Sequence, residues 1–422
     1  MLVHLYKSEM KGGNANRSCI RENRQSMNVT HQEQELRLSK IYHAMESVGV
    51  ESLLLRSISS FLYLTGTVMQ GYIYLTRTEK PIFFLERPTA RLSSPNGARV
   101  HFVRKPELIP DILEEYGLSI NNGTAMELSQ LPVTDFWRLR KLSKDETVSD
   151  VDATALMRKV RSIKTDAELA EIRKNAQIHM EIYRLAPSLY EPGMTDRQWQ
   201  HRIEYQMRRR GSIGVFRCFG WRMEIFMGNL VAGKNAQAPA PYDFAMGGAG
   251  DSAMPFGANG TILKDGMSIM LDMAGNYSEY TTDMTRTYTL GEVDPMVRRA
   301  HDLSIELHEW FSENVKPGMA IAEVYNYCLG RVQDEGLSDY FMGAEWKSKF
   351  VGHGLGLEIN ELPVLTGTWS GCFETNMVIA FEPKFVIPDA GPAGVENTYI
   401  INEDGAENVT PLDMSIIPLG RC

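Results

Sequence analysis

Two acid residues in one apolar stretch are the first candidates for chemistry in this sequence. Residues 268–288 predict a β-hairpin that carries Asp272 and Asp283, one on each strand. With a turn near residues 277–278, the two carboxylates are expected to lie opposite each other, because residues equidistant from a turn face one another. Two unit charges about 4 Å apart repel by about 4 kcal/mol at an effective dielectric of about 20, which favours a cation between them.

A second stretch near the C-terminus repeats this pattern. Residues 377–386 and 394–401 read as apolar strands around a turn at 388–391, and they carry Glu382 and Glu396. For either hairpin alone, an acid that caps the turn or points to solvent is the commoner explanation. Two such hairpins in one chain favour a carboxylate cluster that holds metal.

One of the nine histidines lies in a setting that suits a ligand, whereas His301 and His308, for example, are expected on helix surfaces. His353 stands among alternate glycines in VGHGLGL (351–357), where missing side chains allow a close backbone approach. A lone core histidine usually bonds a carbonyl, but beside two acid pairs a metal ligand is expected. Four carboxylates carry a formal charge of −4, which two divalent ions balance, and oxygen-rich ligands favour manganese, cobalt, iron or zinc over a structural zinc site. Paired ions imply hydrolysis, for example of an amide.

Composition excludes several other classes of function. The 422 residues are 43% hydrophobic and 23% charged, which is typical of a globular protein with two or three domains. A net charge of −9 argues against nucleic acid as the main partner. The five cysteines show no CxxC spacing, and no run approaches the length of a membrane span. We therefore expect a cytoplasmic protein with no membrane partner.

The chain divides into three parts by pattern. Residues 1–30 are polar and read as a disordered extension. Residues 31–150 predict an α/β domain, and residues 151–422 a larger α+β domain. The expected elements of the first domain are a helix from residue 34, strands at 51–55, 61–64, 72–76, 81–85 and 99–103, and helices at 110–116 and 135–142.

The larger domain contains an approximate internal repeat. A helix, a Pro-Gly-Met turn, a second helix and an acid-bearing hairpin occur twice, with the turns at 192–194 and 317–319. An internal duplication explains this order most simply, and it would bring the two hairpins together about a pseudo-two-fold axis.

These residues carry a resemblance to a known family. The segments LDMAGNYSEYTTDMTRTYTLG, VGHGLGLEINELP, AFEPKF and GVENTYIINEDG closely resemble the pita-bread metallopeptidases, which include Xaa-Pro dipeptidase (prolidase), aminopeptidase P, methionine aminopeptidase and the metal-free creatinase. The resemblance runs from about residue 37 to residue 410. It implies a creatinase-like N-terminal domain, a pita-bread catalytic domain, a dinuclear metal-dependent peptidase with manganese as the first candidate ion, and a homodimer.

The resemblance also implies a role for each acid. Asp283 and Glu396 would bridge the two ions, Asp272 would hold one, and His353 with Glu382 would hold the other. Glu382 would also be the general base, which makes it and His353 the expected catalytic residues.

Residues around these ligands have expected roles of their own. Thr285 and Arg286 would orient the ligands, although a plain structural ion pair is an equal alternative for Arg286, which also counts among the residues expected to touch substrate. Segments 217–233 and 247–250 are expected to form the wall and lid of the substrate pocket.

Two positions depart from the X-Pro enzymes of the family. Phe256 and Asn360 stand where those enzymes have histidines that help to bind substrate and move protons. Phe256 can do neither, and Asn360 cannot exchange a proton near neutral pH. Three readings follow: a peptidase that removes an N-terminal residue with altered specificity, a hydrolase or lyase acting on a small polar metabolite at the same metal site, and, ranked last, an inactive peptide-binding scaffold.

Overall fold

The chain forms two compact units in this computed structural model, one over Met27–Ala167 and one from Glu168 to Cys422. The structure describes residues 29–87, 98–220, 223, 225–242 and 246–420. Of the extension predicted over residues 1–30, all but the last two residues lie outside this described part. Each unit is considered by itself below.

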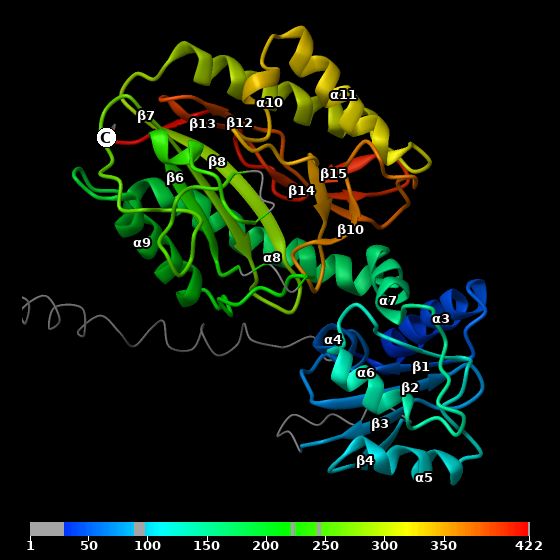
Figure 1. Ribbon diagram of the computed structural model, residues 1–422. Helices are drawn as coiled ribbons and strands as arrows, with labels where there is room; N and C mark the ends of the chain where they lie inside the picture. The colour runs from blue at the N-terminus through cyan, green and yellow to red at the C-terminus, as the bar shows by residue number, and fades with distance from the viewer. Residues whose placement is uncertain (1–28, 88–97, 221–222, 224, 243–245, 421–422) are drawn as a thin grey trace, which may run out of the picture. The chain divides into compact units, whose positions relative to one another are not determined.

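The N-terminal unit is built on a mixed five-stranded sheet (Figure 1). Its order is β4-β3-β2-β1-β5, with the β3–β4 and β1–β5 pairs parallel and the other two pairs antiparallel. Apolar side chains from β1 to β3 and from the α5 helix form its core, among them Leu54, Phe84 and Ile109. The strands are β1 Ser52–Leu55, β2 Gly71–Thr76, β3 Ile82–Leu85, β4 Arg99–Phe102 and β5 Thr124–Met126.

One of the strands predicted for this unit is a helix. The apolar run at 61–64 lies in α4, where Ser57 caps the N-terminus and Gly66 ends the helix in a left-handed conformation at φ 68°. A short apolar run alone does not distinguish a strand from a buried helix, and here the caps decide. The helices of this unit are α3 His31–Ser47, α4 Ile58–Thr65, η2 Pro106–Leu108, α5 Ile109–Glu114, α6 Val133–Arg140 and α7 Ala153–Ser162.

The C-terminal unit has two long helix pairs in the predicted order. Each pair is interrupted by a Pro-Gly-Met turn, and α9 begins with a capping box between Thr195 and Gln198. None of the helices in the described ranges combines the length and apolarity needed to cross a membrane. The helices are α8 Asp166–Leu185, η3 Ala186–Leu189, α9 Asp196–Arg209, η4 Gly233–Gln237, α10 Pro295–Asn314, α11 Ile321–Asp334 and η5 Ser338–Tyr340.

The strands of this unit form three sheets, and α10 and α11 run along one side of them (Figure 1). The orders are β16-β8-β7-β6, β10-β9-β11-β14-β15 and β12-β13. The strands are β6 Gly228–Ala232, β7 Met267–Gly275, β8 Thr282–Leu290, β9 Gly352–Gly354, β10 Glu361–Val364, β11 Val378–Phe381, β12 Lys384–Ile387, β13 Gly391–Gly394, β14 Asn397–Ile401, β15 Ala406–Asn408 and β16 Ile417–Pro418.

The first predicted hairpin exists, but its register differs from the expected one. Strand β7 pairs with β8 so that Asp272 faces Thr285 and Asp283 faces Ala274. The expectation that the two aspartates are directly opposed is therefore wrong by two residues. Because side chains alternate with a period of two, this shift leaves both aspartates on one face of the sheet, as diagonal neighbours.

The second predicted hairpin has its turn where expected, but its strands divide between two sheets. Val378 faces Ile400 in the β11–β14 pair, and Lys384 faces Gly394 in the β12–β13 pair. Both pairs are centred on residue 389, as predicted. Glu382 and Glu396 lie in the break between the two pairs, so their side chains leave the regular ladder close to each other.

Candidate metal centre

Neighbouring strands of the C-terminal unit bring all five predicted ligands into one region. Asp272 lies on β7 and Asp283 on β8, while His353 lies on β9, where it faces Ala380 of β11. Glu382 directly follows β11, and Glu396 directly precedes β14. The two hairpins meet where Thr285 of β8 and Glu396 exchange backbone hydrogen bonds of 3.2 and 3.3 Å.

Glycines around His353 allow the strands to approach closely, as the sequence predicts. A Cβ atom on Gly352 would lie 2.4 Å from the carbonyl oxygen of Ala380, and one on Gly354 would lie 2.1 Å from that of Leu362. Real Cβ atoms do not approach so closely. The glycines therefore serve the packing of β9 between β10 and β11, which fixes the direction of the His353 side chain.

Glu396 presents one paired oxygen and one unpaired oxygen. Its Oε2 atom accepts hydrogen bonds from Thr285 Oγ1 at 2.7 Å and Lys384 Nζ at 2.8 Å. Its Oε1 atom is buried and has no hydrogen-bond partner within the part of the chain that the structure describes. A buried carboxylate oxygen without a partner is costly, so this atom points to a missing positive group.

His353 and Asp283 complete a set of donor atoms around that oxygen. One ligand atom from each of Asp283, His353 and Glu396 can be chosen so that all three lie within 4.8 Å of one another. Nδ1 of His353 lies 3.1 Å from the carbonyl oxygen of Gly354, so it carries the proton and leaves the Nε2 lone pair available. Glu382 Oε1 lies 3.6 Å from that Nε2. Two carboxylates and one imidazole with these properties fit one divalent ion.

A lysine that the sequence interpretation overlooked lies within the same cluster. The ammonium group of Lys384 donates to Asp272 Oδ2 at 2.8 Å, to Glu382 Oε2 at 2.9 Å and to Glu396 Oε2 at 2.8 Å. Its side chain is only 1% exposed. Around Asp272 the positive charge is therefore supplied by the chain itself.

The sequence did contain a signal for this lysine. Lys384 interrupts the apolar strand AFEPKFVI (380–387) two residues after Glu382. Lysine is almost never fully buried unless it is paired, so a lysine inside a buried strand requires carboxylate partners nearby.

The ionisation of the cluster reflects burial and mutual repulsion. Burial, together with the charges of Glu396 and Asp272, raises the pKa of Asp283 well above its ordinary value. Burial also raises the pKa of Glu396 to about 8, against the lowering effect of Lys384. Burial alone would lower the pKa of Lys384, but its three carboxylate partners raise it well above the ordinary value. Burial lowers the pKa of His353, which favours the neutral ring that metal binding requires. The raised pKa values of Asp283 and Glu396 mean that, without a further cation, these two carboxylates bind protons more readily than ordinary acids do.

Arg286 is fully buried beneath this cluster and binds main-chain oxygens. Its guanidinium donates to the carbonyl oxygens of Thr285 at 2.8 Å and Glu396 at 3.0 Å, and also to Asn397 Oδ1 at 2.9 Å. Further bonds reach carbonyl oxygens in the segment 410–413. Its hydrogen bonds thus join the two hairpins through their backbones.

Two histidines of α10 occupy positions that differ from the expected ones. The sequence interpretation placed His301 and His308 on the helix surface, but they are only 1% and 0% exposed. His308 lies 3.0 Å through Nε2 from the carbonyl oxygen of Val395 and 2.8 Å through Nδ1 from the Tyr399 hydroxyl. They lie on the inner face of α10, where they support the segment that carries Glu396.

The side chains of Phe256 and Asn360 both contact other residues of the C-terminal unit. Phe256 is 4% exposed, with ring centroids 5.6 Å from Phe226 and 6.0 Å from Tyr242. The Asn360 amide accepts from the Phe219 backbone nitrogen at 2.6 Å and donates to the Phe219 carbonyl oxygen at 2.9 Å. Asn360 therefore fixes part of the segment 217–233, the predicted pocket wall. Trp221 of that wall lies outside the described residues.

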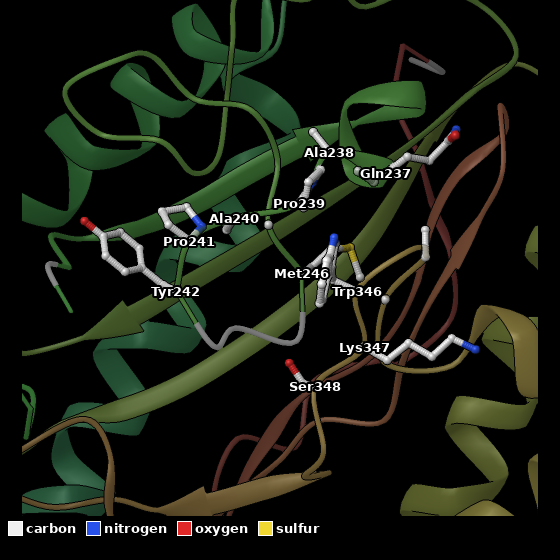
Figure 2. Close-up of a pocket in the computed structure, with 14 residues that line it drawn as sticks. Gln237, Ala238, Pro239, Ala240, Pro241, Tyr242, Met246, Trp346, Lys347 and Ser348 are labelled. Atoms are coloured by element: carbon white, nitrogen blue, oxygen red, sulfur yellow. The ribbon is translucent and has the colours of Figure 1, made fainter. Parts of the chain in front are cut away.

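A pocket with a volume of about 250 Å³ lies in the same unit (Figure 2). Its lining side chains come from residues 236–242, 246–247, 343–344 and 346–348. A backbone hydrogen bond connects the pocket lining to the carboxylate cluster. Met342, which directly precedes one lining segment, donates its N–H to the carbonyl oxygen of Lys384 at 2.8 Å. On the other side, Asn229 faces Asp272 across the ladder and donates to the carbonyl oxygen of Met246 at 3.3 Å.

Comparison with known families covers both units. The description "Metallopeptidase family M24" applies to a family model that matches residues 170–403, and "Creatinase/Prolidase N-terminal domain" to one that matches residues 37–163. These matches agree with the pita-bread resemblance and with a creatinase-like domain before the catalytic domain.

Individual relatives agree with the family models over nearly the whole chain. The Xaa-Pro dipeptidase of Pyrococcus furiosus is 24% identical over 90% of this chain and 99% of its own length. The solved structure of the Xaa-Pro dipeptidase from Bacillus anthracis superposes with a TM-score of 0.76 at 20% identity, covering 92% of this chain and all of its own. An X-Pro aminopeptidase from Thermotoga maritima gives 0.73 at 18% identity, over 90% and 99% of the two chains. The protein is thus a hydrolase of the peptidase class, and it belongs to metallopeptidase family M24.

Proposed function

We propose that this protein is a metal-dependent peptidase that removes an N-terminal residue from peptides, with a specificity that differs from that of Xaa-Pro dipeptidases and aminopeptidases. One observation carries the proposal: the donor atoms of Asp283, His353 and Glu396 converge, and the buried Oε1 of Glu396 has no partner among the described residues. The names of the relatives, which include two Xaa-Pro dipeptidases of Pyrococcus, support a peptide substrate.

Asp283, His353 and Glu396 are the residues we assign to hold a divalent metal ion, with manganese as the first ion to test and cobalt, iron and zinc as alternatives. Bound there, the ion would polarise a substrate carbonyl and lower the pKa of a water molecule. Thr285 holds the Glu396 carboxylate through the 2.7 Å hydrogen bond to Oε2, and Gly354 holds the His353 ring through Nδ1. These contacts orient both ligands before any ion binds.

Glu382 is the residue we assign as general base. Its Oε2 is fixed by the Lys384 ammonium at 2.9 Å, while its Oε1 faces His353 Nε2 at 3.6 Å. A carboxylate with one oxygen fixed and the other directed at the ligand set is positioned to take a proton from the attacking water and to return it to the leaving amine.

Substrate recognition is where we expect the departure from the X-Pro enzymes. Phe256 offers an apolar ring in place of an imidazole, and the Asn360 amide is engaged with the backbone of Phe219. Arg286, which is fully buried, would act on substrate only through the backbones it binds. Phe256 can offer substrate only an apolar contact, and neither Phe256 nor Asn360 can exchange a proton with it. We therefore expect substrates whose binding and cleavage do not require the two histidines of the X-Pro enzymes.

A second candidate has its own support in the Phe256 and Asn360 replacements. In this alternative the same site catalyses hydrolysis of, or elimination from, a small polar metabolite rather than a peptide. The inactive peptide-binding scaffold ranks last, because the residues that match the ligand positions of the family are all present.

The test is a substrate panel with matched metal additions. Purified protein is loaded with manganese, cobalt, iron or zinc and assayed on Xaa-Pro dipeptides, Xaa-Pro tripeptides and dipeptides without proline. We expect amine release from at least one peptide class, and loss of that release in Asp283→Ala. Bound metal with no activity on any peptide would favour the metabolite alternative, whereas absence of both would favour the scaffold.

Location and assembly are also proposals. A cytoplasmic location is supported by two cysteines that remain free in the described part of the chain, Cys328 and Cys372. A homodimer is what the pita-bread resemblance implies. Size-exclusion chromatography with light scattering would test it, and a mass of about 48 kDa would overturn it, since one chain is 47.6 kDa.

A further inference from the structure

We propose that the Lys384 ammonium takes the place of one of the two metal ions expected at this site, so that the protein binds a single divalent ion per chain. The ion would lie between Asp283, His353 and Glu396, while Asp272 serves the lysine. This inference rests on the proposed metal-dependent function and specifies its cofactor. It also changes the expectation from the family resemblance, which was two ions.

The geometry around Lys384 is that of an occupied cation position. An ammonium group has three N–H donors, and each of the three carboxylates Asp272, Glu382 and Glu396 places one oxygen 2.8–2.9 Å from Nζ. Distances of this length are typical of charge-assisted hydrogen bonds. A metal ion bound to the same three oxygens would have to displace the ammonium, because the two cations cannot share that space.

The atoms that remain form one complete set. Glu396 Oε1 is without a partner among the described residues, and His353 Nε2 is the unprotonated ring nitrogen. Asp283 lies with them, and its side chain makes no hydrogen bond to Lys384 among those that the structure records. Asp272 is absent from this converging group. The acids that the family resemblance distributes over two ions are therefore divided here between one lysine and one ion.

Formal charge leads to the same count. The four carboxylates contribute −4 and the ammonium +1, which leaves −3 for external cations to offset. One divalent ion brings the cluster to −1, whereas two would bring it to +1 and place three cations among four carboxylates. In a buried site, where charges are poorly screened, such crowding is costly. A single ion is the better match.

The replacement also changes the chemistry available. Paired ions act together as a clamp on the attacking and leaving oxygens, and a single ion retains only the polarising and water-activating roles. The ammonium supplies a fixed positive charge where the other ion would be, without exchanging with solvent. Such preorganised charge stabilises an anion that develops near it.

The experiment counts ions in matched variants. Wild-type protein, Lys384→Ala and the control Lys234→Ala are saturated with manganese, freed of excess by gel filtration, and analysed for metal and protein. Lys234 is a suitable control because its side chain is 79% exposed in the same unit. We expect one ion per chain in the wild type and in the control, and two in Lys384→Ala, with circular dichroism confirming that all three are folded.

Each other outcome has a definite meaning. Two ions in the wild type, or one ion in both the wild type and Lys384→Ala, would overturn the lysine inference and leave the proposed metal-dependent function intact. No ion in either protein would overturn both. If Lys384→Ala does not fold, Asp272→Asn replaces it in the experiment. We expect Asp272→Asn to keep one ion per chain. Loss of that ion would contradict the assignment of Asp272 to the lysine.

Discussion

Lys384 and Glu396 are joined by a 2.8 Å hydrogen bond from Nζ to Oε2, while the buried Oε1 of the same carboxylate has no partner in the described residues. One carboxylate is therefore shared between a cation that belongs to the chain and a position that fits an added one. Its two oxygens have separate tasks, and each neighbour that fixes Oε2 also determines where Oε1 points.

Thr285 is the neighbour whose contribution can be isolated best. Thr285→Val keeps the shape of the side chain but removes the hydroxyl that donates to Glu396 Oε2 at 2.7 Å. We expect metal affinity to fall about ten- to a hundred-fold, as for other groups that orient a ligand. Titration of the metal-free protein by calorimetry measures the change. The control is Thr287→Val on the same strand, whose hydroxyl instead donates to the carbonyl oxygen of Gly394. Equal losses in the two variants would show that Thr285 acts only on stability.

Arg286 is expected to matter for stability more than for recognition. Arg286→Met removes the six hydrogen bonds that the buried guanidinium makes within the described residues, while the carbonyl oxygens of Thr285 and Glu396 keep the backbone hydrogen bonds that they accept from each other's residue. Each of these hydrogen bonds contributes about 0.5–1.5 kcal/mol net, so we expect loss of the set to lower the free energy of unfolding by at least about 3 kcal/mol. Denaturant unfolding monitored by fluorescence measures it. The control Arg298→Met changes an exposed side chain and should stay within about 0.5 kcal/mol of wild type. Similar free energies of unfolding for the two variants would contradict the conclusion that the buried Arg286 guanidinium joins the two hairpins.

His308, one of the two buried histidines of α10, predicts acid sensitivity. Burial lowers the pKa of His308 from 6.5 to about 3. Between these values the unfolded chain binds a proton that the folded chain does not, so the stabilisation is fully present above pH 6.5 and is lost as the pH falls. The expected slope from this group is about 1.4 kcal/mol per pH unit. Unfolding of the metal-free protein at pH 7, 6, 5 and 4 measures the wild-type slope.

The His308→Gln variant separates this contribution from the rest of the molecule. Glutamine does not titrate, so the variant should lose less stability per pH unit than the wild type, although it is less stable at pH 7. His31→Gln, in which an exposed histidine changes, serves as the control and should keep the wild-type slope. A slope unchanged in His308→Gln would show that other groups cause the acid sensitivity.

Asn360 is expected to order the pocket wall. Its amide makes two hydrogen bonds to the Phe219 backbone, at 2.6 and 2.9 Å. Asn360→Ala removes both, and backbone amides around Phe219 should then exchange with deuterium about ten-fold faster or more, since each net hydrogen bond contributes about 1 kcal/mol. Hydrogen exchange with mass spectrometry measures this. Unchanged exchange would mean that other contacts hold the segment, and amides of the N-terminal unit serve as the internal control.

Local patterns were sufficient to predict much of this fold, because they depend on periodicity and turn chemistry. The strand at 72–76, the helices on either side of the Pro-Gly-Met turn at 192–194 and the turn within 388–391 follow from such patterns, and the structure agrees. The run at 61–64 failed because its helix caps, Ser57 and Gly66, lie outside the apolar segment. The direct opposition of Asp272 and Asp283 failed because register depends on the length of the intervening loop.

The ligand candidates could be selected from the sequence, but the lysine between them was missed. The resemblance assigns roles only to the residues that match the family's metal ligands, and Lys384, although it lies in the segment AFEPKF, is not at one of those positions. Its role depends on three acids that come from two hairpins, 112 residues away in the case of Asp272 and 12 in the case of Glu396. Only the folded chain shows that their oxygens meet at one nitrogen.

The number and position of bound ions test the central claim most directly. Crystals grown with manganese and measured at its absorption edge would show each ion as an anomalous peak. We predict one peak, beside Asp283, His353 and Glu396, with the Lys384 side chain still directed at Asp272. Two peaks, or a single peak among Asp272, Glu382 and Glu396 with the lysine displaced, would contradict the account.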